Sequence, residues 1–252
     1  MLLTVLGCAG SVPAPESPAS GYLVRTGNAS MVLDLGNGTF GALQRYLDPF
    51  TLDALILSHL HPDHCADVSA LTVYRRYHPH PPSSEPLPLY GPSDAAERLV
   101  AAYAPNAGER NTTDLSDVYH FRSYAGTASI GPFDVRATPV EHPCEAYALR
   151  VHHAGRVLVY SGDTGPCPQL AELATGADVL LVEASWPHRV DNPPGIHLSG
   201  TDAGRAATAA GVGRLLITHV PPWTDPEQVL GEAKAAFDGP TELIRPGAHY
   251  EI

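Results

Sequence analysis

The sequence is poor in basic residues. Its 15 lysines and arginines stand against 27 aspartates and glutamates, giving a formal net charge of -12 at pH 7, and the single lysine is Lys234. Arg75 and Arg76 form the one adjacent basic pair. A protein that grips a long nucleic acid neutralises its phosphates with a basic stripe, and this sequence shows none. A large nucleic acid is therefore disfavoured as a partner.

Long apolar runs are also missing. No stretch of the sequence approaches the ~20 apolar residues that a membrane-spanning helix needs, so no membrane partner is expected. Residues 1–6 predict a first strand and not a signal peptide, because they have no basic start and reach Gly7 too soon. We therefore expect a cytoplasmic protein.

Cysteine is scarce and shows no metal-binding or disulfide spacing. The 4 cysteines are Cys8, Cys65, Cys144 and Cys167, and no two of them form a CxxC pair. Reduced thiols are the expectation for such a set. Cys65 and Cys144 lie near histidine-rich segments, where we expect them to be packing neighbours and not ligands.

The length and hydropathy suit one α/β domain over residues 1–252, with 44% hydrophobic residues and no internal repeat or linker. Apolar periodicity predicts strands at 2–6, 21–26, 30–35, 53–58, 117–124, 129–140, 146–152, 156–161, 178–183, 214–218 and 240–244. Helices are predicted near 39–48, 65–77, 93–103, 166–175, 200–210 and 225–237. The strands from 117 to 161 are expected to form a meander, and the last third alternates helix and strand.

The most informative segment is His59-Leu60-His61-Pro62-Asp63-His64, which follows the predicted strand 53–58. Pro62 favours extended backbone at His61, so the period of two puts His59 and His61 on one side, where they can share a metal. Asp63 and His64 then start a helix and can reach a second metal nearby.

Three further polar residues stand just past apolar, strand-like runs. His142 follows residues 133–140, Asp163 follows 156–161, and His219 follows 214–218. Functional groups collect at the carboxyl ends of strands, so these residues and the histidine-rich segment are expected to meet. Together they offer five histidines and two aspartates, enough for two divalent metals side by side. Nitrogen and oxygen ligands without thiolate favour zinc, with manganese or iron left open.

These motifs resemble the metallo-β-lactamase superfamily across nearly the whole chain: HLHPDH, the Glu141-His142 pair, SGDT at 161–164 and THV at 218–220 occur in the family's order. The resemblance implies an αββα sandwich of two mixed sheets flanked by helices. It also implies that His59, His61 and His142 bind one metal, that Asp63, His64 and His219 bind the other, and that Asp163 bridges them.

Other segments indicate a branch of that superfamily. Asp163 occupies a position where classical zinc β-lactamases use cysteine, which argues against that branch. LGCAGSVP at 6–13, YSGDT at 160–164, VEASW at 182–186 and HLS at 197–199 resemble the ribonuclease Z and cyclic-nucleotide phosphodiesterase branch. In that branch the histidine matching His197 lies near the leaving group and binds no metal, and the acid matching Glu183 neighbours it. A purely structural role for Glu183 is equally open.

The substrate prediction is a small phosphodiester, with cyclic nucleotides first. HLHPDH resembles the motif of class II cyclic-nucleotide phosphodiesterases, and only twenty residues separate His142 from Asp163, where ribonuclease Z enzymes carry a long RNA-gripping arm. Alternatives are a ribonuclease Z-like endoribonuclease that processes tRNA 3′ ends, a glyoxalase-type thioester hydrolase sharing all seven ligands, and a metal-bearing binding protein. A homodimer is left open.

The expected mechanism needs no protein nucleophile. Two divalent metals would lower the pKa of a water between them and aim it at phosphorus, with Asp63 among the residues that hold them. His197, if protonated, would donate to the departing ribose oxygen. The loops 78–88 and 105–114 are expected either to border the groove or to be plain surface connections, and the long, Pro-rich loop 184–200 is expected to be functional and to carry His197 toward the metals. His78, His80, His152 and His153 are predicted to be loop or hairpin residues and not ligands.

Overall fold

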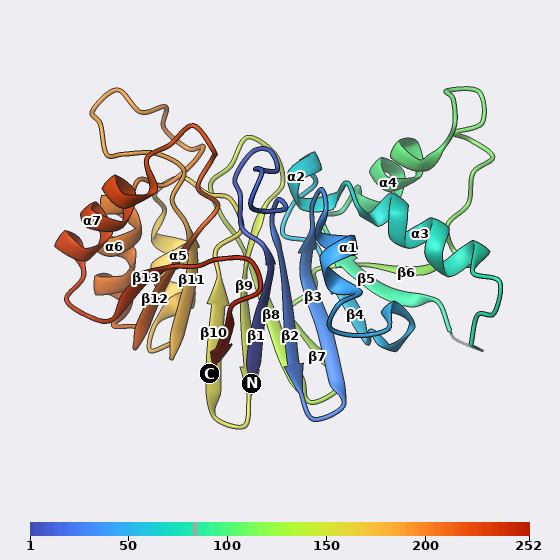
Figure 1. Cartoon of the computed structure of the whole chain (residues 1–252), viewed down its shortest axis with the longest axis horizontal. Coiled ribbons are helices and arrows are strands. Elements are labelled where there is room, and N and C mark those ends of the chain that lie inside the picture. The colour runs from blue at the N-terminus through green and yellow to red at the C-terminus, as the bar shows by residue number, and fades with distance from the viewer. Residues whose placement is uncertain (83–84) are drawn as a thin grey trace.

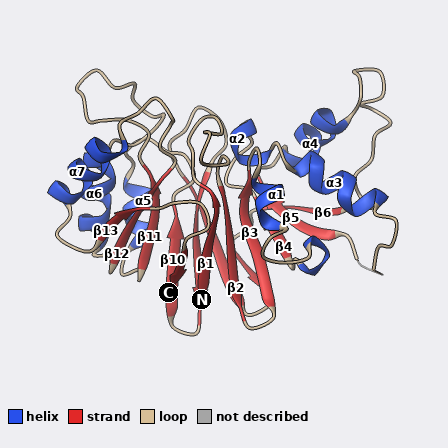
Figure 2. Ribbon diagram, viewed as in Figure 1, coloured by secondary structure: helices blue, strands red, loops and turns tan. Residues whose placement is uncertain are grey.

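A computed structural model that describes residues 1–82 and 85–252 has two seven-stranded β-sheets packed face to face. Helices α1–α4 cover the outer side of one sheet and α5–α7 that of the other, and the two chain ends lie close together at the lower edge (Figure 1). Figure 2 shows the same arrangement as helix, sheet, sheet and helix layers. The predicted αββα fold is confirmed.

The first sheet has the order β14-β1-β2-β3-β4-β5-β6. Its strands are antiparallel from β14 to β3 and parallel from β3 to β6. Their bounds are β1 Leu2–Gly7, β2 Gly21–Thr26, β3 Ala29–Leu35, β4 Ala54–Ile56, β5 Leu87–Gly91, β6 Tyr119–Ser123 and β14 His249–Glu251.

The second sheet has the order β13-β12-β11-β10-β9-β8-β7 and is also mixed. It is antiparallel from β7 to β10 and parallel from β10 to β13. Its strands are β7 Thr127–Ile130, β8 Phe133–Pro139, β9 Tyr147–His153, β10 Arg156–Tyr160, β11 Val179–Glu183, β12 Arg214–Thr218 and β13 Thr241–Leu243.

The helices are short, and the longest have eleven residues. Among the described residues, none is long and apolar enough to cross a membrane. They are α1 Thr39–Leu43, α2 Pro62–Cys65, α3 Val68–Tyr77, α4 Ala95–Tyr103, α5 Pro168–Ala174, α6 Gly200–Ala210 and α7 Pro226–Ala236, with a 3₁₀ turn at Pro49–Thr51.

Three apolar layers hold this arrangement together, and β3 shows how. Met31 and Leu33 point into the layer between the two sheets, while Val32 and Leu35 point into the layer under α1, α3 and α4. Successive side chains of a strand face opposite sides, so a strand buried on both faces is mostly apolar, and in β3 the buried exceptions are Ser30 and Asp34. A third layer lies between the second sheet and α5–α7.

Several sequence predictions were wrong in detail. β5 was missed because its first two residues fall in the segment 78–88, which its Pro-rich sequence assigned to a loop. The β4–β5 pairing starts at Leu89, so Pro88 lies outside that ladder. Residues 83 and 84 of the segment lie outside the described residues.

The meander predicted over residues 117–161 does not include its first strand. β6 pairs in parallel with β5 in the first sheet, so the meander contains only β7, β8, β9 and β10. The predicted strand 129–140 is divided into β7 and β8 by a turn at Gly131, whose φ of 55° suits glycine. Helix 39–48 ends at Leu43, helix 65–77 begins only at Val68 after the separate turn α2, and the terminal strand β14 was not predicted.

Candidate metal centre

The HLHPDH segment leaves β4 at the upper edge of the first sheet and forms a single helical turn. His61 is the N-cap of α2 with φ -66° and ψ 147°, the extended conformation that Pro62 was expected to impose. α2 follows at once and contains Asp63 and His64, both buried. The change from strand to helix therefore directs the two halves of the motif to different positions.

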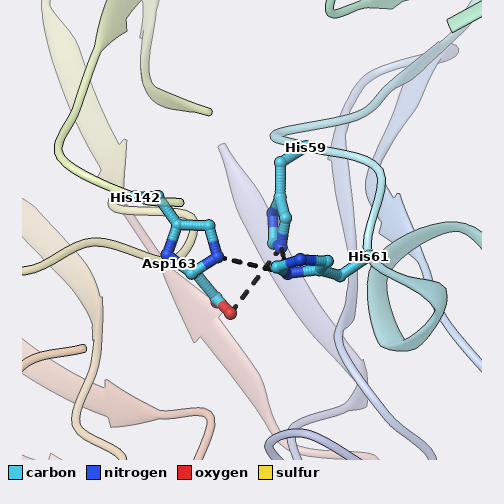
Figure 3. A group of neighbouring side chains, drawn as sticks. All are labelled: His59, His61, His142 and Asp163. Carbon is cyan, nitrogen blue, oxygen red and sulfur yellow. Dashed lines mark hydrogen bonds and ion pairs between the residues drawn. The ribbon is translucent and has the colours of Figure 1, made fainter. Parts of the chain in front are cut away.

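The structure brings His59, His61, His142 and Asp163 together, as Figure 3 shows. His61 Nδ1 lies 3.1 Å from His59 Nε2 and 3.1 Å from His142 Nε2. His59 Nε2 lies 3.7 Å from Asp163 Oδ2. Four donor atoms from two sheets thus converge on one point.

A second group lies directly beside the first and shares Asp163 with it. This group is Asp63, His64, Asp163 and His219, all buried. His64 Nε2 is 3.1 Å from Asp163 Oδ1, and His219 Nε2 is 3.1 Å from Asp63 Oδ2 and 3.4 Å from Asp163 Oδ2. Asp163 Oδ2 therefore faces one histidine of each group, His59 at 3.7 Å and His219 at 3.4 Å, so this carboxylate lies between the two groups.

The spacing of the nitrogen and oxygen atoms in both groups suits a bound metal ion. Ligand atoms ~2.0–2.1 Å from a tetrahedral zinc ion lie about 3.3–3.4 Å from one another. The distances between ligand atoms given above, 3.1 to 3.7 Å, lie on either side of this value. In the described part of the chain, His64 Nε2 and Asp163 Oδ1 are buried and, although they lie 3.1 Å apart, form no hydrogen bond of normal geometry. Buried polar atoms without a partner are costly, and a cation would satisfy both.

The outer nitrogens of these histidines are held by neighbouring groups. His142 Nδ1 donates to the carbonyl oxygen of Ile196 at 2.9 Å, which leaves its Nε2 lone pair facing the cluster. Ser58 Oγ lies 3.1 Å from His59 Nδ1, and Ser185 Oγ lies 3.0 Å from His219 Nδ1. Such contacts fix the tautomer and orientation that metal-binding histidines need.

Asp34 is the residue that sequence reasoning missed. Its buried carboxylate accepts hydrogen bonds from Ser58 N at 2.6 Å, Ser58 Oγ at 2.7 Å, His64 Nδ1 at 2.7 Å and Tyr160 OH at 2.7 Å. Asp34 orients His64 and joins β3, β4 and β10 below the cluster. A lone acid at the end of a strand was the available signal, the same context that identified Asp163.

Backbone strain marks the same region. Asp34 and His219 both have φ of 57°, which is unfavourable for residues with a Cβ and is concentrated at functional sites. A Cβ at Gly10 would lie 2.3 Å from the His219 carbonyl oxygen, so the glycine of the N-terminal loop permits this approach. The chain therefore keeps a strained conformation to direct His219 inward.

The electrostatics of the cluster favour a cation. Burial raises the pKa of Asp163, but His219, His64 and His59 outweigh it and hold that pKa well below its usual range. Burial lowers the pKa of His64, yet the Asp163 and Asp34 carboxylates raise it well above its usual value. A divalent metal must displace the His64 proton, so metal binding should release protons.

Glu183 and His197 form a hydrogen-bonded pair at the rim of the cluster. His197 Nδ1 lies 2.9 Å from Glu183 Oε1 and 3.8 Å from Asp163 Oδ2. Burial lowers the pKa of His197, but the Glu183 carboxylate opposes it and the net effect raises the pKa to about 9. Glu183 therefore favours the protonated form of His197.

Glu183 makes structural hydrogen bonds as well as the contact with His197. Its Oε1 also accepts from Thr164 N at 2.8 Å, and its Oε2 accepts from Ser185 Oγ at 2.9 Å. These bonds tie β11 to the loop after Asp163, while the contact with His197 reaches the open side. Glu183, His197 and His219 are also close enough to hold a metal, but the oxygens of Glu183 already accept three hydrogen bonds.

Other predicted features fall in different places. The 184–200 loop contributes Ile196 and His197 and borders the cluster, as expected. The 105–114 loop lines a separate cavity with Arg76 and Tyr103, so its predicted place at the groove was wrong.

His78 packs on Phe50 and Tyr74, away from the cluster. Cys65 is buried, whereas Cys144 is exposed with Sγ 4.0 Å from His61 Nε2, so only Cys65 is a packing residue.

We expect Asp34→Asn to weaken metal binding by about 10- to 100-fold, because an amide cannot accept from all the donors around it and can no longer fix His64. Metal affinity is measured by competition with a chromophoric chelator, alongside circular dichroism to confirm folding. Tyr160→Phe removes one of the four hydrogen bonds and serves as the control, with a smaller effect. Unchanged affinity in Asp34→Asn would show that His64 is oriented by packing alone.

Comparison with known proteins places these observations in a family. The family model described as "Beta-lactamase superfamily domain" matches residues 31–220. An uncharacterized protein of Mycobacterium leprae is 52% identical over 99% of this chain and 88% of its own length. A probable metallo-hydrolase of Bacillus subtilis, YhfI, is 30% identical over the full length of both chains, and its crystal structure covers 99% of each chain with a TM-score of 0.86. A ribonuclease Z of Mycolicibacterium gilvum is 30% identical over 90% of this chain and 86% of its own.

The chain belongs to the β-lactamase superfamily, with the metallo-β-lactamase fold. It is a metal-dependent hydrolase of that superfamily.

Proposed function

We propose that this protein hydrolyses small phosphodiesters, with cyclic nucleotides as the leading class, using two divalent metals, of which zinc fits best. The observation that carries the proposal is the position of His197. It lies outside both ligand groups, yet its ring is 5.7 Å from that of His142 and 5.4 Å from that of His219, centroid to centroid. A protonated group there faces whatever is bound over the cluster.

The metals would be held by His59, His61, His142 and Asp163 on one side and by Asp63, His64, His219 and Asp163 on the other. When bound, they would supply an activated water and positive charge for the phosphate oxygens. The remaining work falls to the chain itself. Asp163 holds the two groups together, Asp34 and Ser185 orient histidines, and the Glu183–His197 pair holds a proton beside the leaving oxygen.

The need for an acid distinguishes the substrate classes. A ribose alkoxide is a poor leaving group and gains from protonation, whereas a thiolate leaves readily because its conjugate acid has a pKa of ~8.5. A histidine kept protonated by a buried carboxylate is therefore useful for a phosphodiester and of little use for a thioester. This favours phosphodiester cleavage over the glyoxalase-type alternative.

Transfer RNA processing is the second candidate, supported by the similarity to the ribonuclease Z of M. gilvum. The residues between His142 and Asp163 form only β9, β10 and their turn, where Ala154 and Gly155 have φ of 50° and 77°. No arm extends from this hairpin. The net charge of -12 also gives little attraction for a long polyanion.

A substrate panel tests the proposal. We expect turnover of 3′,5′-cyclic nucleotides and bis-p-nitrophenyl phosphate, weak turnover of a glutathione thioester, and no processing of a transfer RNA precursor. Efficient precursor processing with a steep loss on adding salt would contradict it, since that dependence reports many phosphate contacts. Fast thioester cleavage without phosphodiester cleavage would favour the glyoxalase-type reaction.

A further inference from the structure

A cavity of about 570 Å³ lies beside His197, between the 184–200 loop and the start of α7. It adjoins the metal cluster, because Ser11, Ser185 and His197 line it and each approaches cluster residues. Ser11 N lies 3.4 Å from His219 Nε2, and Ser185 Oγ lies 3.0 Å from His219 Nδ1. A molecule bound over the metals can therefore extend into this cavity.

Both tryptophans of the chain, Trp186 and Trp223, line the cavity. The Trp186 ring packs edge-on against the His197 ring, with centroids 5.2 Å apart. Trp223 is 69% exposed, although a large aromatic side chain is normally covered. Pro187, Ile196 and Pro221 add further apolar surface. The cavity thus offers flat aromatic surface at the edge of a polar site.

Polar groups complete the wall. Arg189, Asn192 and Gln228 line the same cavity. Asn192 Nδ2 donates to the Pro187 carbonyl oxygen at 2.9 Å, and Gln228 Nε2 donates to Glu232 Oε1 at 3.4 Å, so both amides are held in place. Amide side chains hydrogen-bond the edges of bases, while tryptophan stacks on their faces. Aromatic surface bordered by amides is the chemistry that recognises a nucleobase.

We propose that this cavity binds the nucleobase of the substrate, stacked on Trp223, and makes the enzyme selective for nucleoside phosphodiesters over base-free ones. The proposal rests on the proposed phosphodiesterase function and names the part of the substrate that the enzyme selects. The leaving oxygen of a cyclic nucleotide belongs to the ribose that carries the base. A base in this cavity therefore accords with an acid at His197, which lines it.

The first test compares two substrates with the same reacting ring. One is a 3′,5′-cyclic nucleotide and the other is the 3,5-cyclic phosphate of 1,2-dideoxyribose, which has no base. Trp223→Ala should lower kcat/KM for the nucleotide by about 5- to 100-fold, the range for removing one stacking ring, and change the base-free substrate less than about twofold. Val190→Ala is the control, because Val190 is fully exposed on the 184–200 loop beside the cavity but does not line it.

The second test uses binding alone. Because the only tryptophans, Trp186 and Trp223, both line the cavity, intrinsic tryptophan fluorescence reports directly on it. A nucleoside 5′-monophosphate should quench this fluorescence saturably, and ribose 5-phosphate should not. Trp223→Ala should weaken the binding measured through the remaining Trp186 by about the same 5- to 100-fold factor.

These outcomes separate the two proposals. Saturable quenching by the nucleotide without hydrolysis of any phosphodiester would uphold the cavity and overturn the proposed function. Hydrolysis of both cyclic phosphates, with Trp223→Ala affecting them equally, would uphold the function and overturn the cavity. Quenching by ribose 5-phosphate equal to that by the nucleotide would also overturn it.

Discussion

Asp163→Ala should lose both metals and at least about 10³-fold in turnover. The two carboxylate oxygens face different histidines, with Oδ1 3.1 Å from His64 and Oδ2 3.4 Å from His219, and Oδ2 also faces His59 at 3.7 Å. Removing this group takes one ligand from each site at once. Lewis-acid stabilisation alone is worth several kcal/mol, and each ~1.4 kcal/mol is a factor of ten. Elemental analysis of protein purified without chelator gives the metal count, which should be near two for the wild type.

Asp63→Ala is the matched comparison, because Asp63 belongs to only one of the two groups. It should keep the metal held by His59, His61 and His142 and lose the other. We therefore expect two metals per chain in the wild type, one in Asp63→Ala and none in Asp163→Ala. If Asp163→Ala retained one tightly bound metal, the carboxylate would belong to a single site and the bridging assignment would be wrong.

The fold was predictable where one physical signal dominated. β3, β10, β11 and β12 are apolar on both faces and were found from their apolar runs. β5 was not found, because it follows a Pro-rich run assigned to a loop and itself contains Pro88, which a strand accepts only where the neighbouring strand leaves its nitrogen unpaired; pairing is a tertiary property. The same holds for β6, whose place in the first sheet depends on β5.

The seven candidate ligands were predictable because they follow strand ends, and the structure brings them together. Asp34 has the same local context but no second polar residue beside it, so the sequence did not distinguish it. Its importance arises from Ser58, His64 and Tyr160, which come from three other segments and meet it only in the folded chain. The Trp186–Trp223 cavity was missed for the same reason.

The role of His197 can be separated from a structural role by the choice of leaving group. His197→Ala should keep both metals and lose about 10²- to 10⁴-fold in turnover of a cyclic nucleotide, the usual contribution of a general acid. Glu183 keeps His197 protonated, with a pKa of about 9 set by burial and the opposing carboxylate. Glu183→Gln removes the charge while keeping the shape, and should show a smaller loss in the same direction.

The loss should shrink for bis-p-nitrophenyl phosphate, because p-nitrophenolate leaves without a proton whereas a ribose alkoxide does not. His188→Ala is the control, since His188 lies on the same loop and contacts Ser199 at 2.8 Å, away from the cluster. Its turnover of both substrates should stay near that of the wild type. Equal losses on both substrates in His197→Ala would make His197 a positioning residue, and loss of metal would make it a ligand. Either result would require the proton to come from another group at the rim of the cluster.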